Sequence, residues 1–292
     1  MKKTKEIFAL VKLLDDPDEF VYSNVKNKLI SYGKGAIPFL EEFWEENSLD
    51  ASYLDRIENL IHEIQFNIVF DDLKKWIESD DHDLLKGILI LNKYQYPDLD
   101  EEPVIALIEK IKQDVWLEIT NELTSFEKIN VVNKILFEQY GFSGNKKNYH
   151  SPKNSFLNNV LETKKGNPLM LSAIYMLVTQ DLGLPIYGVN LPSHFVLCYM
   201  DLDNINYYLT DNIEEKILVY INPFSKGVMM NHKEITHFLN QIKAPHEEKY
   251  FSPCENKDII KRIISNLIYS YKKLGYQEKM EELQILKDTF NS

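Results

Sequence analysis

One histidine of the chain stands where its side chain could do acid–base chemistry. His194 follows Pro192-Ser193 and opens an apolar run that ends at Met200, so we expect it at the start of a strand. Histidine titrates near neutral pH and can therefore accept a proton from a reacting group or donate one to it. A histidine placed after Pro-Ser could instead simply cap the loop. On the residues alone, both interpretations stay open.

The element that would position such chemistry is a helix that precedes His194. A turn at Gly166-Asn167-Pro168 leads into a segment that is apolar on nearly all sides. A helix of this composition is normally buried. Its apolar residues are Leu169, Leu171, Ala173, Ile174, Met176, Leu177, Val178 and Leu182.

Strands are expected after this helix. The pattern predicts a first strand over His194–Met200, a turn at Asp203–Asn206 and a second strand over Tyr207–Thr210. A third strand is predicted over Ile217–Ile221 and stops at Asn222-Pro223-Phe224. The pattern indicates a small antiparallel sheet beside a buried helix.

Helices are predicted for the N-terminal and C-terminal regions of the chain. Residues 1–135 show short helical stripes separated by acidic, Pro or Gly turns, and this spacing resembles one unit of a HEAT-type repeat. Longer helices are predicted near Leu54–Phe70, Leu84–Tyr94 and Pro103–Glu122. At the other end, helices over Asp258–Leu274 and Gln277–Phe290 resemble half of a tetratricopeptide unit.

Composition restricts the partners and the compartment. The formal net charge is -12, which argues against a nucleic-acid or anionic-membrane surface. Only two cysteines are present, Cys198 and Cys254, which fits a reducing compartment. No apolar run approaches the roughly 18 residues of a membrane span. No signal-peptide cleavage site follows the first apolar run. We therefore expect a cytoplasmic protein.

Several common catalytic and binding motifs are missing from the sequence. There is no Gly-x-Ser-x-Gly, no Gly-Lys-Ser/Thr phosphate loop and no Gly-x-Gly-x-x-Gly. His232 and His237 are five residues apart and do not share a helix face, so a zinc site is not indicated. We expect no metal and no cofactor.

Four linked segments carry a family resemblance. They are LFEQYGFSGN, NSFLNNVLETKKGNPLMLSAIY, LGLPIYGVNLPSHFVL and INPFSKG, in this order. The chain resembles the bacterial SirB-type family of transglutaminase-like proteins, and the resemblance covers nearly all of it. It implies a helix-rich α+β fold with a papain- or transglutaminase-like core over residues 136–250. Residues 1–135 would be the HEAT-like region and residues 251–292 the C-terminal helical pair.

The resemblance also implies where chemistry would occur. In such cores a thiolate lies at the start of the buried helix, a histidine at a strand start shares its proton, and an Asp or Asn orients that histidine. His194 matches the histidine and Asn222 matches the orienting residue. The cysteine position, however, is occupied by Pro168. Proline supplies no thiol and lacks a backbone N–H, although it is well tolerated in a first helical turn.

No other residue is a convincing nucleophile. Cys198 lies four residues after His194 on the same predicted strand, roughly 13 Å away. Sequence alone does not place Cys254. Ser172 lies one helical turn after Pro168 and could point at the site, but a serine within a helix more often bonds a backbone carbonyl.

Two functions remain. We favour a non-catalytic relative, a pseudoenzyme that binds a protein or peptide in the former catalytic cleft. The alternative is a hydrolase or acyl-transfer enzyme that uses His194 and Asn222 with Ser172 or an activated water. The residues expected to line the cleft are Gly166, Asn167, Pro168, Pro192, Ser193 and Asn154.

Overall fold

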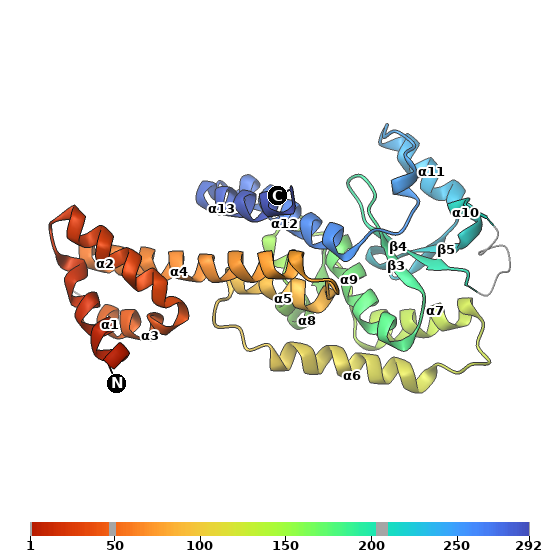
Figure 1. Cartoon of the computed structure of the whole chain (residues 1–292). Helices are drawn as coiled ribbons and strands as arrows, with labels where there is room; N and C mark the ends of the chain where they lie inside the picture. The colour runs from red at the N-terminus through yellow and green to blue at the C-terminus, as the bar shows by residue number, and fades with distance from the viewer. Residues whose placement is uncertain (1, 47–50, 203–209, 292) are drawn as a thin grey trace. The chain divides into compact units, whose positions relative to one another are not determined.

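The computed structural model describes residues 2–46, 51–202 and 210–291 of the chain (Figure 1). The chain divides into two compact units. The first comprises Met1–Lys75 and Lys93–Pro97, and the second comprises Trp76–Asn92 and Asp98–Ser292. The three-part division expected from the sequence, with boundaries near residues 135 and 250, stays a prediction.

The fold is α+β and rich in helices, as predicted. The helices are α1 (Lys2–Lys12), α2 (Glu19–Tyr32), α3 (Ile37–Glu46), α4 (Ala51–Glu78), α5 (Leu84–Gln95), α6 (Glu102–Glu118), α7 (Ser125–Asn133), α8 (Leu157–Thr163), α9 (Pro168–Thr179), α10 (Ile213–Lys216), α11 (His232–Gln241), α12 (Asn256–Leu274) and α13 (Gln277–Asp288). The strands are β1 (Ser143–Gly144), β2 (Lys165–Gly166), β3 (Ile186–Val189), β4 (Val196–Met200), β5 (Ile217–Asn222) and β6 (Val228–Met230).

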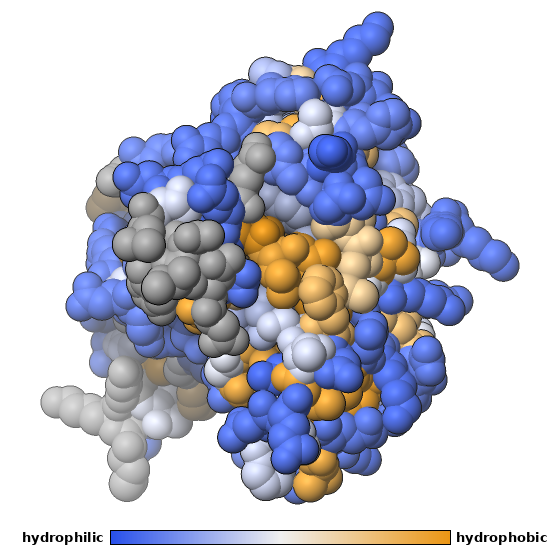
Figure 2. Space-filling view, turned by 90° about the vertical axis from the view of Figure 1, so that its right-hand side faces the viewer, coloured by the Kyte–Doolittle hydropathy of each residue, from blue (hydrophilic) through white to orange (hydrophobic). Residues whose placement is uncertain are grey.

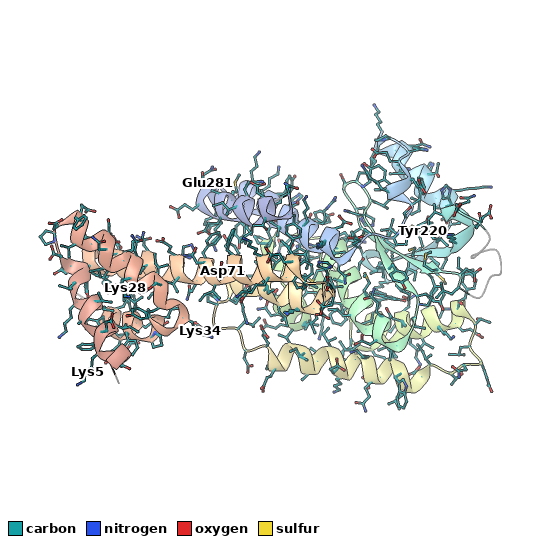
Figure 3. The ribbon with its side chains drawn as sticks, in the orientation of Figure 1. Lys5, Lys28, Lys34, Asp71, Tyr220 and Glu281 are labelled. Atoms are coloured by element: carbon teal, nitrogen blue, oxygen red, sulfur yellow. The ribbon has the colours of Figure 1, made fainter. Side chains whose placement is uncertain are left out.

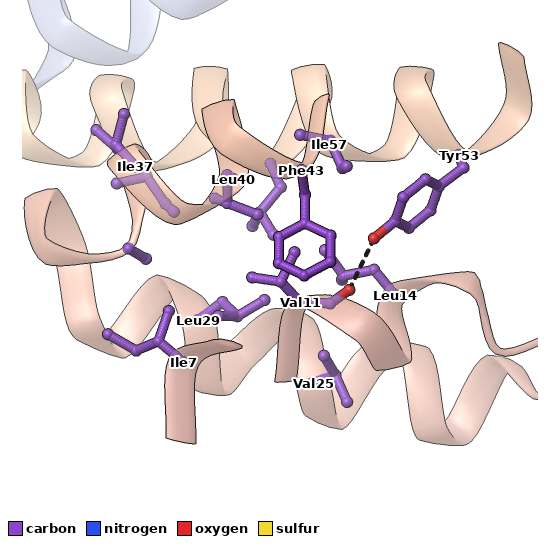
Figure 4. Packing of buried hydrophobic residues seen from close by; sticks show 13 residues of the cluster. Ile7, Val11, Leu14, Val25, Leu29, Ile37, Leu40, Phe43, Tyr53 and Ile57 are labelled. Carbon is purple, nitrogen blue, oxygen red and sulfur yellow. Dashed lines mark hydrogen bonds between the residues drawn. The ribbon is translucent and has the colours of Figure 1, made fainter. Parts of the chain in front are cut away.

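The first unit is built from apolar stripes on α1, α2, α3 and α4 that meet in one core (Figure 4). The Asp18 side chain caps α2 by accepting from the Phe20 N–H, and α2 ends at Gly33, which adopts a φ of +55°. The Tyr53 hydroxyl donates to the Val11 carbonyl at 3.0 Å, so the only polar end of this buried ring is satisfied. Lys5, Lys28 and Lys34 lie on the outside of this unit (Figure 3).

Helix α9 is the centre of the second unit. Asn167 caps it by accepting from the Met170 N–H at 2.8 Å, and Pro168 occupies its first position. Every residue of α9 except Leu177 is buried, which confirms the prediction from its composition. It packs against α6, α8, α12, β3 and β4, so nearly all of its surface is covered by protein.

A four-stranded antiparallel sheet lies beside α9, in the order β3-β4-β5-β6. One face of the sheet shares an apolar core with α11. Tyr220 of β5 (Figure 3) is buried, and its hydroxyl donates to the Phe251 carbonyl at 3.0 Å. Strands β3 and β6 and helix α11 were not predicted individually. The predicted turn at 203–206 and residues 207–209 of the predicted second strand lie outside the described residues.

The first predicted strand begins later than expected, at Val196 and not at His194. Ser193 adopts a φ of +60°, and the His194 N–H reaches back to the Leu191 carbonyl at 3.4 Å. This turn precedes His194, which is not paired in the sheet, so the histidine lies in the loop that enters β4. The sequence prediction for this boundary was wrong by two residues.

The C-terminal helical pair is present as predicted. Helix α12 ends at Gly275, which adopts the left-handed conformation, and α13 returns along it. The likeness to a tetratricopeptide unit and the HEAT-like character of the first helices stay predictions.

The surface of the second unit is mostly hydrophilic on the side that carries α7, α10 and β5, with an apolar area near its centre (Figure 2). Among the described residues, no helix has both the length and the apolar character needed to cross a membrane.

Candidate functional site

A cavity of about 480 Å³ lies in the second unit, beside the start of α9. Four segments form its wall: the loop before α8, the first turn of α9, the turn that contains His194, and one face of α12. The lining residues are Tyr149, His150, Ser151, Asn167, Pro168, Leu169, Ser193, His194, Phe195, Arg262, Ser265, Asn266, Tyr269 and Ser270.

His194 and Asn222 meet at the edge of this cavity. The His194 Nε2 lies 3.3 Å from the Asn222 Oδ1, although 28 residues separate the two positions in the chain. Asn222 is the last residue of β5, and its Oδ1 also accepts from the Ser225 N–H at 3.3 Å. The antiparallel pairing of β4 with β5 brings the two side chains together, because the entry of β4 lies beside the exit of β5.

The hydrogen bonds around Asn222 define the tautomer of the histidine. Since the Asn222 oxygen already accepts from the Ser225 N–H, it is an acceptor for His194 as well. The His194 Nε2 therefore carries the proton, and the Nδ1 of the neutral ring is left as an acceptor. Burial lowers the pKa of His194, the bond to Asn222 opposes this, and the positive charge of Arg262 lowers the pKa further. The neutral ring is thus favoured at pH 7.

The start of α9 offers the cavity no nucleophile. Pro168 lines the cavity at the first helical position, where it has neither a thiol nor an N–H. Asn167 is fixed on both ends of its amide, because its oxygen accepts from the Met170 N–H and its Nδ2 donates to the Ser155 hydroxyl at 2.8 Å. These two residues serve to start and hold the helix.

Ser172 does not line the cavity. Its side chain is fully buried, and its hydroxyl donates to the Pro168 carbonyl at 2.8 Å. A hydroxyl bonded to the preceding helical turn is the usual arrangement for serine in a helix interior. The structure thus places Ser172 within the packed protein.

Neither cysteine of the chain lines the cavity. Cys198 is buried in β4, between Tyr187 of β3 and Tyr220 of β5, and burial raises the pKa of its thiol strongly. Cys254 donates its backbone N–H to the Gly188 carbonyl at 2.8 Å. Burial raises the pKa of the Cys254 thiol to about 12. Both side chains are therefore neutral thiols at pH 7, and thiols are poor nucleophiles compared with thiolates.

Three other residues predicted for the cleft lie outside the cavity wall. Gly166 pairs with Gly144 between β2 and β1, and Pro192 precedes the turn at Ser193. Asn154 is buried, and its Nδ2 donates to the carbonyls of Asn148 and Tyr149 at 2.7 and 3.0 Å. Asn154 therefore holds the loop that presents Tyr149 to the cavity.

Sequence reasoning missed the contribution of α12. Arg262, Ser265, Asn266, Tyr269 and Ser270 lie at helical spacing on one face of this helix and line the cavity. The opposite face carries buried apolar side chains. The polar stripe was visible in the sequence, but its spacing indicates a common face without indicating what that face covers.

Among the described residues, no group of three or more His, Cys, Asp or Glu side chains is placed to hold a metal ion.

Comparison with known proteins finds similarity over the part of the chain that contains most of the cavity wall. A family model described as "Transglutaminase-like superfamily" matches residues 102–265. A UPF0162 protein from Xylella fastidiosa is 29% identical over 190 residues, which are 63% of each chain. F-box only protein 21 from Mus musculus is 27% identical over 170 residues, which are 56% of this chain and 24% of that protein.

A UPF0162 protein from Vibrio cholerae is 24% identical over 155 residues, or 53% of each chain. The matches to the UPF0162 proteins from Xylella and Vibrio thus span 63% and 53% of those proteins' lengths. No solved structure matches the chain significantly.

Proposed function

Because the chain belongs to the transglutaminase-like superfamily, we propose that it uses the cavity beside α9 as a binding cleft for a segment of another protein. It would form no covalent intermediate with that segment. This is the pseudoenzyme interpretation of the cleft, and the family's thiol chemistry is the alternative that it replaces.

One observation carries the proposal. The position at the cavity where the family's nucleophile is expected is Pro168, and both cysteines of the chain lie elsewhere with raised thiol pKa values. Acyl transfer through a thioester needs an accessible thiolate. Without an accessible thiolate, the cleft can still bind a ligand but cannot form a thioester with it.

The character of the wall supports a peptide as the ligand. Tyr149, His150 and Tyr269 supply aromatic surface, whereas Ser265 and Asn266 supply hydrogen-bonding groups along α12. Peptides present both apolar side chains and a row of backbone N–H and C=O groups, so a wall of mixed character suits them. The helical flanks outside the core would add surface for the rest of the partner.

A second candidate function rests on the His194–Asn222 pair. A neutral histidine whose Nδ1 is a proton acceptor could activate a water for hydrolysis, and the bond to Asn222 would orient the ring. This alternative needs no protein nucleophile, so it does not depend on Ser172.

The test for binding uses the purified full chain and a random peptide library displayed on phage. Asn266→Trp places a large side chain in the cavity from α12, whereas Lys272→Trp adds the same side chain on an exposed part of the helix. We expect peptides selected on the wild type to lose binding to Asn266→Trp and to keep binding to Lys272→Trp. Peptides that bind all three proteins equally would show that the cleft is not their site.

The same peptides separate binding from catalysis. Each is incubated with the wild type and with His194→Ala, together with a primary amine as acyl acceptor, and its mass is then measured. We expect intact peptide from both proteins. Peptide that is cleaved, deamidated or joined to the amine by the wild type alone would establish the hydrolase or acyl-transfer function instead.

A further inference from the structure

The cavity beside α9 contains no acidic side chain among the described residues that line it. This is unexpected for a chain with 45 Asp and Glu residues and a formal net charge of -12. One of the chain's only two arginines, Arg262, faces the same cavity. The local charge of the cavity is therefore opposite in sign to that of the protein as a whole.

Arg262 has few partners within the protein. Its Nη1 donates to the Asn190 Oδ1 at 3.3 Å, and no carboxylate of the described residues forms an ion pair with it. A guanidinium has five N–H donors, and burial of its charge without a counter-ion is unfavourable. Burial lowers the pKa of Arg262, but a guanidinium remains charged at neutral pH. The side chain thus presents unused donors and an unbalanced charge.

Other features of the cavity wall add to this positive potential. The N-terminal end of α9 lines the cavity through Pro168 and Leu169, and this end of a helix carries a partial positive charge. Tyr149 lies close enough for its pKa to be lowered by Arg262, although burial raises that pKa by more. Ser265 and Asn266 add neutral polar groups one turn from Arg262.

We propose that Arg262 binds a carboxylate group of the ligand in this cavity. The proposal rests on the proposed function in one respect, which is that the carboxylate belongs to the peptide segment in the cleft. It adds the chemical class that the cleft selects, an anionic peptide, and it names the residue that selects it.

The number of charges favours a carboxylate over a phosphate. Arg262 is the only arginine or lysine among the described residues that line the cavity. The other basic side chains there are the histidines His150 and His194, and the neutral form of His194 is favoured. A carboxylate carries one negative charge and matches the planar fork of one guanidinium with two parallel hydrogen bonds. A phosphate monoester carries about -1.5 to -2 charges at pH 7 and would remain under-compensated.

Two parts of a peptide could supply this group, namely its C-terminus or an Asp or Glu side chain. The recognising chemistry is the same, so the experiment has one arm for each. The probes are N-acetyl-Ala-Ala-Ala with a free C-terminus, N-acetyl-Ala-Glu-Ala-amide, and N-acetyl-Ala-Ala-Ala-amide, which has no carboxylate. Inorganic phosphate is a fourth probe.

Binding is measured by NMR of the arginine side chains, because the chain has only two arginines. Protein labelled with ¹⁵N-arginine gives one Nε–Hε signal from Arg56 and one from Arg262, and the signal that disappears in Arg262→Lys is assigned to Arg262. Arg56 is an internal control, because its guanidinium already bonds the Leu14 and Asp16 carbonyls.

We expect at least one carboxylate probe to shift the Arg262 signal saturably while the Arg56 signal stays in place. The amide probe should bind roughly tenfold more weakly or worse, since it lacks the charge-assisted bonds. Equal shifts by the amide probe, or no saturable shift by either carboxylate, would overturn the proposal. Tighter binding of phosphate would overturn the choice of carboxylate.

The outcome is separable from that of the proposed function. If library peptides bind through the cleft but bind Arg262→Gln as well as the wild type, the carboxylate assignment fails while peptide binding stands. If the carboxylate probes shift the Arg262 signal but no library peptide loses binding to Asn266→Trp, the anion site stands and the proposal of peptide binding in the cleft fails.

Discussion

The two arginines of the chain lie in its two units and have opposite surroundings. In the first unit, the Arg56 Nη1 donates to the Leu14 and Asp16 carbonyls at 3.0 and 3.2 Å, and the guanidinium lies 4.5 Å from the centre of the Tyr22 ring. In the second unit, Arg262 has one hydrogen bond with the described residues, to Asn190, and it also faces a cavity. Arg56 is thus held by acceptors within its own unit, whereas most donors of Arg262 have no acceptor among the described residues.

The difference shows how a binding site can be distinguished from a structural one. Around Arg56, the protein supplies acceptors for the donors, and the neighbouring apolar side chains form a continuous core. Around Arg262, the protein supplies no counter-charge among the described residues and places a neutral histidine nearby. A polar group that the protein leaves partly unsatisfied is a candidate for contact with a ligand.

The largest loss of stability is expected from Gly227→Ala. This substitution tests whether tight packing elsewhere in the second unit supports the open cavity. Gly227 has a φ of +75°, and an added Cβ would lie 1.9 Å from the Asn133 Oδ1. Asn133 also donates to the Gly227 carbonyl and accepts from the Tyr175 hydroxyl. We expect a loss of about 3 kcal/mol or more in the free energy of unfolding, measured by urea denaturation.

Gly183→Ala is the matched control for this substitution. Gly183 has a similar φ of +71°, but no atom lies within 4 Å of the added Cβ. Only backbone strain should remain, at a cost of about 1–2 kcal/mol. Equal costs for the two variants would show that Asn133 moves aside easily, and the turn after Asn222 would then not be rigidly supported.

Arg56→Ala tests the structural side of the comparison. The substitution removes the donors to two partly buried carbonyls and the contact with Tyr22, so we expect a loss of about 2 kcal/mol in the unfolding free energy. Lys26→Ala removes a charge from the same unit, but it breaks only a surface ion pair with Glu63. That control should cost about 1 kcal/mol or less. A cost for Arg56→Ala no greater than this would contradict the structural role.

The pH dependence of stability tests the environment of His194. Its pKa in the folded protein is lowered, chiefly by burial, so the unfolded chain binds the proton more readily. The wild type should therefore lose stability as the pH falls below the unfolded value of about 6.5, until the folded histidine is also protonated. His194→Gln should show a shallower decline over this range in denaturation curves at matched pH. Parallel curves for the two proteins would contradict the lowered pKa.

The smallest effect on stability is expected from Arg262→Gln. Because the guanidinium has no carboxylate partner among the described residues, its removal breaks one hydrogen bond and relieves a buried charge. We expect a change of about 0.5 kcal/mol or less in either direction, measured by urea denaturation. A loss as large as that of Arg56→Ala would show that Arg262 is structural and would remove the contrast between the two units.

The sequence by itself determined the local elements and the buried helix. Apolar residues on nearly all sides of α9 required a covered helix, and Asn167-Pro168 defined its start, because capping and the missing proline N–H act over a single turn. The apolar run of β5 and the helices α12 and α13 followed from periodicity in the same way. The left-handed conformation of Ser193 was not predictable, so the start of β4 was misplaced.

The cavity was decided by the tertiary structure. Family resemblance suggested that His194 and Asn222 belong together, and the pairing of β4 with β5 places them 3.3 Å apart. Arg262 lies 72 residues from its hydrogen-bond partner Asn190, and no local pattern relates the two. Periodicity tells which residues of a helix share a face, but the packing of α12 against α9 determines what that face meets. That packing places the positive charge of Arg262 in the cavity, where no carboxylate of the described part of the chain pairs with it.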